Sequence, residues 1–393
     1  MLQIMPGIDW VGVRHADLEI FDELFPTHNG TTYNAYLVRG RDKTALIDTV
    51  KEPFTDELLA KLEAAGGLDK IDLVVVNHTE PDHSGALRHL LARRPDLPVY
   101  CTKPAQNFLA QLLNAPFNAQ VVSDGQELDL GGRTLRFIVA PYLHWPDTMF
   151  TYLVEDAVLF PCDAFGAHYC AQRLFDDEIP DFSKDFHFYF DCIMRPFKDK
   201  VREAVAKVES LPLKMICPSH GPVHRRNPQA VIDTYRRLAT QPPASIGPRA
   251  LMLTLSSHGN TRQMAAAVRE GVESQGFEVI EMRLCELRDS DLRDELELAD
   301  LVLVGTATIN RDAPPQVWHA LSLFSLVTPR AKVAAAFGSF GWSGEAVKLV
   351  EERLKGLRFK LGVPGLTLRF KPTEEDLAAC RKFGVEAAQS VSA

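Results

Sequence analysis

One short run of the sequence carries four side chains that can bind metal. The run Asn77-His78-Thr79-Glu80-Pro81-Asp82-His83-Ser84-Gly85 directly follows the apolar stretch Ile71–Val76. A loop at the end of a strand can wrap these side chains around metal, and their number suits two ions better than one. Imidazoles together with carboxylates favour iron, manganese or zinc, and the run lacks the thiolates that mark a structural zinc site. On its own, the run is also compatible with a solvated polar turn.

Three further candidate ligands also follow apolar segments. A lone histidine in such a place is more often a core or surface residue than a ligand. Four positions that share this placement favour a site, because open sites in layered α/β proteins gather their ligands at strand ends. The segments and candidates are Arg136–Ala140 before His144, Ala157–Phe160 before Asp163, and Lys214–Cys217 before His220.

The elements that must position these residues fall into two regions. The stretch Thr240–Arg249 contains three prolines and a glycine, which break both helices and strand ladders. A chain of 393 residues is also long for one core. We therefore expect one domain over residues 1–245 and a second over residues 246–393.

The first region reads as mixed sheets covered by helices. Its predicted strands are Tyr33–Val38, Lys43–Ile47, Leu73–Val76, Thr134–Val139 and Val158–Phe160, and its predicted helices include Thr55–Ala65 and Gly85–Arg94.

The second region alternates apolar strands with amphipathic helices, which indicates a doubly wound parallel sheet. Its predicted strands are Leu251–Leu255, Glu278–Arg283, Leu301–Val304 and Val333–Phe337, and its predicted helices are Thr261–Gln275 and Ser343–Leu354.

Composition and charge exclude some function classes. The net charge of −9 argues against nucleic-acid binding, because no basic footprint is present. We see neither a signal peptide nor an apolar run of about 18 residues, so we expect a cytoplasmic protein without a membrane anchor. The seven cysteines are dispersed without a Cys-x-x-Cys pair and read as free thiols. We therefore expect no rubredoxin or iron–sulfur module in this chain, and electrons supplied from outside it.

A possible anion site opens the second region. The loop Ser256-Ser257-His258-Gly259-Asn260-Thr261 follows a predicted strand and begins a helix. Hydroxyls, a glycine and backbone N–H groups at a helix N-terminus can hold a phosphate. The loop lacks the signatures of nucleoside-triphosphate and dinucleotide sites, and a simply capped helix remains the alternative.

Two later loops are expected at the same edge of the predicted sheet, where an open α/β sheet binds its ligand. They are Gly305-Thr306-Ala307-Thr308-Ile309-Asn310 and Gly338-Ser339-Phe340-Gly341-Trp342-Ser343-Gly344. Trp342 among small residues suits a planar ring, although an ordinary edge aromatic would look the same.

The order and spacing of the candidate ligands resemble the metallo-β-lactamase superfamily, with one departure. Glu80 stands where the hydrolases of that superfamily carry a second histidine, and this pattern is similar to that of flavodiiron proteins (A-type flavoproteins). The exchange makes a site more anionic and favours iron over zinc. The resemblance implies a metallo-β-lactamase-like αββα sandwich followed by a flavodoxin-like sheet. It extends over about residues 1–390.

The resemblance also implies ligands and cofactors. It places His78, Glu80 and His144 on one iron, Asp82, His83 and His220 on the other, and Asp163 between them. The three loops of the second region resemble those that hold FMN in flavodoxins, with His258 in place of the usual aromatic, Ala307 in place of a proline and Ser343 in place of a glycine. His28 could approach the diiron pocket, or it could be a surface turn residue.

The implied activity is reduction of O2 to water, of NO to N2O, or of both. The ligands do not reveal which gas is preferred. A separate rubredoxin, ferredoxin, flavin reductase or F420-type coenzyme would supply electrons, and a head-to-tail homodimer or dimer of dimers would bring FMN close to iron. Two alternatives remain: a hydrolase with an appended flavodoxin domain, against which Glu80 argues, and a flavin carrier whose first domain is redundant, against which the complete ligand set argues.

Overall fold

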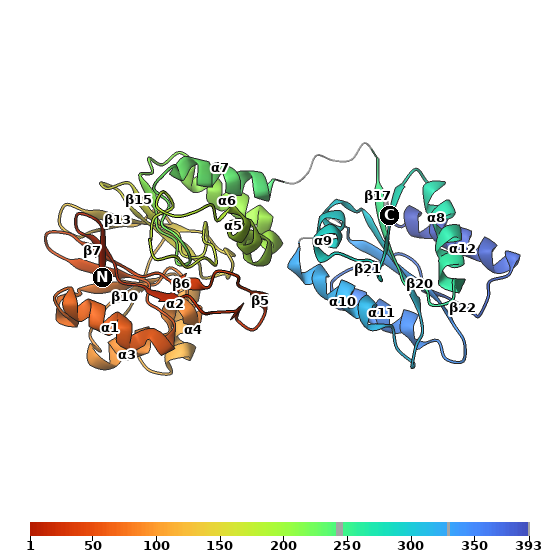
Figure 1. Cartoon of the computed structure of the whole chain (residues 1–393), viewed down its shortest axis with the longest axis horizontal. Coiled ribbons are helices and arrows are strands. Elements are labelled where there is room, and N and C mark those ends of the chain that lie inside the picture. The colour runs from red at the N-terminus through yellow and green to blue at the C-terminus, as the bar shows by residue number, and fades with distance from the viewer. Residues whose placement is uncertain (241–246, 328–330, 392–393) are drawn as a thin grey trace. The chain divides into compact units, whose positions relative to one another are not determined.

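The computed structural model describes residues 1–240, 247–327 and 331–391. The chain divides into two compact units, Met1–Thr240 and Gln241–Ala393 (Figure 1). The expected boundary between residues 245 and 246, and most of the predicted linker, lie outside the described residues.

The first unit contains two larger sheets and two small strand pairs. The first sheet has the order β1 (Leu2–Met5), β2 (Ile8–Trp10), β7 (Tyr36–Arg39), β8 (Thr44–Ile47), β9 (Leu73–Val75), β10 (Val99–Cys101) and β11 (Ala119–Val121). The second has the order β12 (Glu127–Asp129), β13 (Thr134–Val139), β14 (Met149–Leu153), β15 (Val158–Phe160) and β16 (Met215–Ile216). The small pairs join β3 (Val13–His15) to β6 (Thr31–Tyr33) and β4 (Ile20–Phe21) to β5 (Phe25–Pro26).

Helices cover the outer face of each sheet (Figure 1). They are α1 (Thr55–Ala64), α2 (Pro81–Ser84), α3 (Leu87–Arg93), α4 (Lys103–Leu113), α5 (Ser183–Tyr189), α6 (Lys198–Val208) and α7 (Pro228–Ala239). Helix α4 illustrates how the sequence specifies them: Thr102 caps its first turn by accepting a hydrogen bond from the Ala105 N–H, and Leu109 and Leu113 continue one buried face.

The strand residues alternate between two cores, which makes this unit an αββα sandwich. In β8, Ala45 and Ile47 pack into the core between the sheets, whereas Leu46 packs against the layer of α1, α3 and α4. In β14, Phe150 and Tyr152 face the layer of α5–α7. Both faces of each central strand are buried, so the strands read as short apolar runs.

The ends of several strands meet at one edge of the sandwich. Strand β13 pairs antiparallel with β14, and β14 pairs antiparallel with β15, so β13 and β15 run in the same direction. Strand β16 is parallel to β15. The carboxyl ends of β13, β15 and β16 therefore lie on the same side, and three of the candidate ligands, His144, Asp163 and His220, follow these ends.

The second unit is a doubly wound parallel sheet. Its strands are β17 (Arg249–Thr254), β18 (Glu278–Arg283), β19 (Leu301–Ala307), β20 (Val333–Phe340), β21 (Lys360–Leu361) and β22 (Leu366–Arg369). Its helices are α8 (Asn260–Glu273), α9 (Asp289–Leu298), α10 (Pro315–Ser322), α11 (Glu345–Gly356) and α12 (Glu374–Gln389). The strand order β18-β17-β19-β20-β21, with β22 also on β20, is the flavodoxin-like order.

The helices of this unit pack on both faces of its sheet. Leu251 and Leu253 of β17 belong to the core beneath α9–α11, whereas Ala250 and Met252 belong to the core beneath α8 and α12. The order of the sheet reverses between β17 and β19, which is where such folds bind ligands. Among the described residues, no helix is long and apolar enough to span a bilayer.

One predicted strand is wrong in its extent. The sequence predicts a single strand over Tyr33–Val38, but the structure has β6 and β7 with a break at Asn34 and Ala35. The side chain of Asn34 accepts a hydrogen bond from Trp10 Nε1 and donates to the carbonyl oxygens of Pro218 and Gly221. The chain leaves the ladder here because Asn34 holds the loop that carries His220.

Candidate metal centre and ligand cavity

Asn77 anchors the loop that carries the first four candidate ligands. Its backbone N–H and its side-chain amide both donate to Asp48 at the end of β8, at 2.7 and 2.9 Å. Its side-chain oxygen accepts from Thr151 Oγ1 of β14 at 2.7 Å. Asn77, Asp48 and Thr151 are all fully or almost fully buried. The loop is thus fixed to both sheets just before His78.

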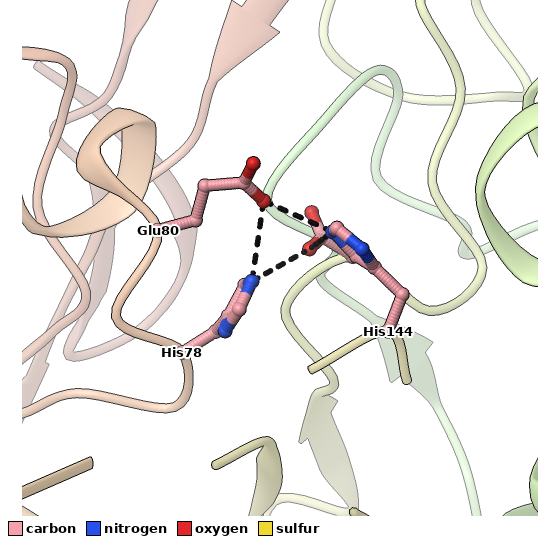
Figure 2. Close-up of side chains that lie close together, drawn as sticks. His78, Glu80 and His144 are labelled. Carbon is pink, nitrogen blue, oxygen red and sulfur yellow. Dashed lines mark hydrogen bonds and ion pairs between the residues drawn. The ribbon is translucent and has the colours of Figure 1, made fainter. Parts of the chain in front are cut away.

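Three of the candidate ligands form a first donor group: His78, Glu80 and His144 (Figure 2). Glu80 Oε2 lies 3.2 Å from His78 Nε2 and 2.9 Å from His144 Nε2. Glu80 is the residue just before helix α2, and His144 lies between β13 and β14. Two strand-end loops that are distant in sequence therefore meet at one carboxylate oxygen.

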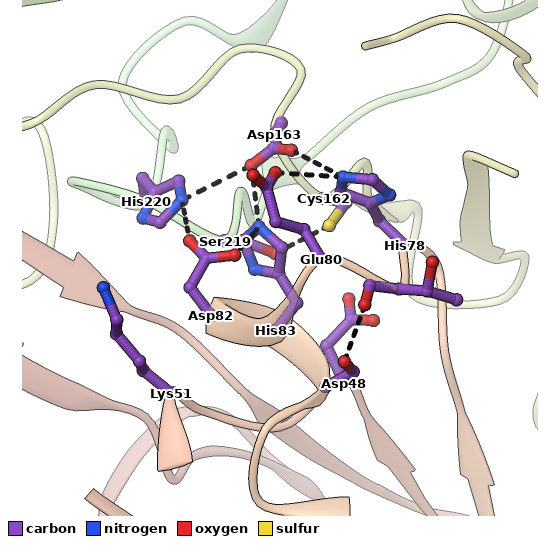
Figure 3. Close-up of polar contacts among 12 residues, drawn as sticks. Asp48, Lys51, His78, Glu80, Asp82, His83, Cys162, Asp163, Ser219 and His220 are labelled. Carbon is purple, nitrogen blue, oxygen red and sulfur yellow. Dashed lines mark hydrogen bonds and ion pairs between the residues drawn. The ribbon is translucent and has the colours of Figure 1, made fainter. Parts of the chain in front are cut away.

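Three others form a second donor group: Asp82, His83 and His220 (Figure 3). His83 Nε2 lies 3.1 Å from Asp82 Oδ1, and His220 Nε2 lies 3.0 Å from Asp82 Oδ2. Asp82 and His83 belong to α2, while His220 follows β16. All three side chains are buried.

Asp163 lies between the two groups, with one oxygen toward each. Its Oδ2 is 3.6 Å from His78 Nε2 and 3.5 Å from His144 Nε2. Its Oδ1 is 3.0 Å from His83 Nε2 and 3.4 Å from His220 Nε2. The seven predicted ligands thus converge, and their grouping has the membership that the sequence resemblance implies.

The positions of the donor atoms suit binding of metal ions better than hydrogen bonding among the side chains. Among the described residues, both oxygens of Asp82, both ring nitrogens of His83 and Asp163 Oδ2 are buried without a hydrogen bond, which is costly. A nitrogen or oxygen donor binds a transition metal at about 2.1 Å, so two donors at right angles around one ion lie about 3 Å apart. The separations within each group match that spacing.

The charges of the site are balanced by protons where no metal is bound. Burial alone would lower the pKa of His78, but hydrogen bonds to Asp147 and Glu80 raise it to about 10. Burial also opposes the shift of His144, whose close contacts with the carboxylates of Asp163 and Glu80 raise its pKa to about 10. Despite burial, the charge of His83 holds the pKa of Asp163 well below its usual range. The pKa of Glu80 is also lowered, despite burial, by its hydrogen bonds to His144 and His78, and metal cations would take the place of the ring protons of His78 and His144.

A buried thiol lies beside the second group. Cys162 Sγ is within 4.8 Å of donor atoms of His83 and Asp163, and it accepts a hydrogen bond from Ser219 Oγ at 3.3 Å. Burial, followed by the charge of Asp48, raises the pKa of this thiol well above its usual value. A neutral thiol is a poor ligand, so Cys162 is not counted among the donors.

The structure also reveals neighbours of the donors that the sequence did not single out. Tyr189 of α5 donates a hydrogen bond to Asp163 Oδ1 at 3.1 Å. His168 is buried, with its ring 5.3 Å from that of His220. His28, which was flagged, is instead exposed at a separate cavity of about 410 Å³ that His168 also lines. No sequence spacing marks Tyr189 or His168, because helix and loop packing bring them in.

The second unit has a cavity of about 400 Å³ at the reversal of its strand order. All three predicted loops contribute to it, together with Phe370, which the sequence did not flag. Its lining residues are Ser257, His258, Asn260, Ala307, Thr308, Ile309, Ser339, Phe340, Gly341, Trp342 and Phe370. The indole of Trp342 is 73% exposed, so a planar face is available beside the cavity.

The other predicted residues of these loops do not line the cavity: Ser256, Gly259, Thr261, Thr306, Asn310, Ser343 and Gly344. Some have structural roles instead. Gly259 precedes α8 with φ +83°, a conformation that favours glycine. Buried Thr261 bonds Ser339 Oγ at 2.8 Å, which ties the first loop to the third. The hydroxyl of Thr306 donates to the carbonyl oxygen of Ala307.

Comparison with known families divides the chain as the fold does. The family described as ODP family beta lactamase matches residues 31–221. The flavodoxin family matches residues 253–384. The first match includes all seven convergent donors, and the second includes the cavity of the second unit.

Individual relatives resemble almost the whole chain. A type A flavoprotein of Rhodobacter capsulatus is 42% identical over 97% of this chain and 89% of its own length. A protein of Moorella thermoacetica named nitric oxide reductase is 39% identical, with 99% and 98% covered. The solved structure of rubredoxin oxygen:oxidoreductase from Desulfovibrio gigas is 30% identical, with a TM-score of 0.72 and 99% and 98% covered. The chain therefore belongs to the flavodiiron proteins, the type A flavoproteins in which a metallo-β-lactamase-like domain precedes a flavodoxin domain.

Proposed function

We propose that this protein reduces O2 to water, NO to N2O, or both, at a pair of irons that receives electrons from FMN. One observation carries the proposal: Asp163 directs one oxygen toward each of two donor groups, and Glu80 completes the first group. A carboxylate in place of an imidazole favours iron over zinc. The names of the relatives from M. thermoacetica and D. gigas support the same chemistry.

We assign the metal ligands by the two donor groups. His78, Glu80 and His144 would hold one iron, and Asp82, His83 and His220 the other, with Asp163 bridging them. The fit rests on the ligand atoms, which converge and which lack hydrogen bonds in several cases; five of the seven side chains are buried, and Glu80 and His144 are partly buried. Iron would supply the one-electron steps and the binding of the gas, and FMN would pass on electrons.

The chain's own residues hold charge and geometry for this chemistry. Reduction of O2 to two waters consumes four electrons and four protons, and coupling of two NO to N2O and one water consumes two of each. The three carboxylates of the donor set, Glu80, Asp82 and Asp163, offset the positive charge of bound metal. Burial raises the pKa of Tyr189 well above its usual value, so its phenol remains protonated and keeps donating to Asp163.

We infer that the cavity of the second unit holds FMN. The loop from Ser257 to Gly259 precedes α8, which begins at Asn260 and whose N-terminal N–H groups favour a phosphate. Trp342 and Phe370 would flank the flavin ring, because both are aromatic, exposed and adjacent to the cavity. Thr261 and Thr306 would hold the loops in place without contacting the cofactor themselves.

Electron delivery requires a donor and an arrangement of subunits. We propose a separate protein or coenzyme donor, such as rubredoxin, ferredoxin, a flavin reductase or an F420-type coenzyme. We further propose a head-to-tail homodimer, or a dimer of dimers, that sets the FMN of one subunit beside the irons of the other. Coexpression of a metal-ligand variant with an FMN-loop variant tests the exchange, because only mixed dimers would regain activity. No regain of activity would refute it.

The central experiment measures metal, flavin and gas turnover on the same preparation. We expect about two irons and one FMN per chain. Anaerobically reduced protein should be oxidised by O2, by NO, or by both, and a rate difference above about tenfold, or about 1.4 kcal/mol in barrier, would identify the preferred gas. Bound zinc with hydrolase activity and no gas reduction would instead establish the alternative, a hydrolase with an appended flavodoxin domain.

A further inference from the structure

Three of the donor histidines differ in what their second ring nitrogen contacts. His220 Nδ1 lies 2.7 Å from the carbonyl oxygen of Thr32, which is a neutral acceptor. His83 Nδ1 forms no hydrogen bond among the described residues. His78 Nδ1 lies 3.1 Å from Oδ2 of Asp147, which is a carboxylate. Of these three histidines, only His78 of the first donor group therefore has a carboxylate hydrogen-bonded to its second ring nitrogen.

Asp147 is held rigidly in this position. Its side chain is fully buried, and the same Oδ2 also accepts from the backbone N–H of Thr79 at 2.8 Å and from Thr79 Oγ1 at 2.9 Å. Its carbonyl oxygen accepts from the hydroxyl of Thr102, the N-cap of α4, at 2.8 Å. One carboxylate thus fixes both the ring of His78 and the backbone that leads to Glu80.

Asp147 also comes from a loop that carries a donor itself. It follows His144 by three residues, so the loop between β13 and β14 supplies one donor of the first group and orients another. When Nδ1 of His78 donates to Asp147, Nε2 faces Glu80 and Asp163, so its lone pair would be available to a metal ion held with these two carboxylates. A carboxylate behind a metal-binding imidazole also makes it a stronger electron donor.

We propose that Asp147 is a positioning residue that orients His78 and makes the first metal position, formed by His78, Glu80 and His144, the more easily oxidised of the two. This inference rests on the proposed diiron function. Among the described residues, no carboxylate is hydrogen-bonded to the second ring nitrogen of His83 or His220 in the second position, and buried Asp48 acts on His83 and His78 only through its charge. A stronger donor stabilises the ferric over the ferrous state, so the reduction potential of the first position is the lower one.

The substitution Asp147→Asn tests this, because it removes the charge and keeps the shape. Partners of this kind typically contribute 10- to 100-fold in metal affinity. We expect the preference of the first position for ferric over ferrous iron to fall about tenfold, which raises its potential by about 59 mV. The measurement is a redox titration followed by the electron paramagnetic resonance of the half-reduced diiron state. The reduction potential of the second position, which is the higher of the two, should change by much less.

A second variant separates charge from mere loosening of the loop. Thr102→Val keeps the size of the side chain and the carboxylate of Asp147, but removes the hydroxyl that anchors the loop. We expect its two potentials to match those of the unchanged protein. Equal shifts in both variants, or full iron with unchanged potentials in Asp147→Asn, would overturn the proposal.

If Asp147→Asn binds too little iron for a redox titration, metal affinity can be measured instead. Titration of the metal-free variant with Co2+, followed by its visible absorption, should show one site weakened 10- to 100-fold and the other unchanged. Equal weakening of both sites, or of neither, would contradict the inference. Failure of the proposed function can be distinguished from failure of this inference. If the unsubstituted protein binds two irons but reduces neither gas, the proposed function is refuted, while the potentials and metal affinities of the variants can still be compared.

Discussion

Replacement of Asp163 by alanine should remove both metal ions at once, because this residue faces both donor groups. Its two oxygens lie 3.0–3.6 Å from the Nε2 atoms of four histidines. Loss of a residue that only supports a ligand already weakens metal binding 10- to 100-fold. Since we assign Asp163 as a ligand of both positions, we expect at least 100-fold at each, or about 2.8 kcal/mol per ion.

The assay for Asp163→Ala compares iron and flavin in the purified protein. Iron should fall from about two per chain to near zero, and reduction of O2 and NO should fall with it. The FMN spectrum should persist, because the cavity to which we assign FMN belongs to the other compact unit. Retention of two irons with turnover of either gas would refute the bridging role.

Asp9→Asn serves as the matched control for Asp163→Ala. Asp9 is also a nearly fully buried carboxylate of the first unit, but its partner is Arg39. This variant should keep its iron even if it loses some stability. Equal iron loss in both variants would mean that general destabilisation, rather than a lost ligand, explains the result.

Three further predictions follow from the site. Glu80→His should shift the metal bound after expression from iron toward zinc and should abolish gas reduction. Metal analysis and gas consumption measure this, and a variant that keeps its iron and full turnover would contradict the role that we assign to Glu80. In the metal-free protein, His78 and His144 have pKa values raised to about 10, so they stabilise its fold below about pH 6.5, and this contribution is lost as the pH rises toward 10. Because metal must displace these protons, the apparent affinity for metal should rise with pH up to about pH 10, by up to tenfold per pH unit for each proton displaced. Calorimetry of metal binding that finds no proton release at pH 7.5 would refute this. Thr261→Val removes the buried hydrogen bond to Ser339 and should weaken FMN binding by roughly 1 kcal/mol, about fivefold, whereas Thr261→Ser should not. Equal FMN affinities of the two variants in a fluorescence titration would argue against a role for this hydrogen bond.

The seven side chains that the sequence marks as candidate ligands converge in the structure, and they could be found because metals select particular side-chain types. Histidine and carboxylates in one short loop, and again after three other strands, are unusual enough to point to a site. Ala307 and Trp342 could likewise be placed at the cavity of the second unit, because the alternation of strands and helices locates the loops of a parallel sheet. What spacing could not give is which oxygen of Asp163 faces which group, since that depends on the sheet order β12–β16.

The residues that hold the donors were harder to find, because their contacts are long-range and use ordinary polar groups. Asn34 reads as one more residue of a strand, yet it breaks that strand to bond the loop around His220. His28 attracted attention as a histidine, whereas buried His168 lies against His220. A ligand is constrained by the chemistry of the metal, but its support can be any donor or acceptor that the fold brings within about 3 Å. For that reason we expect substitutions at supporting residues such as Asn34 to impair metal loading without any ligand being changed.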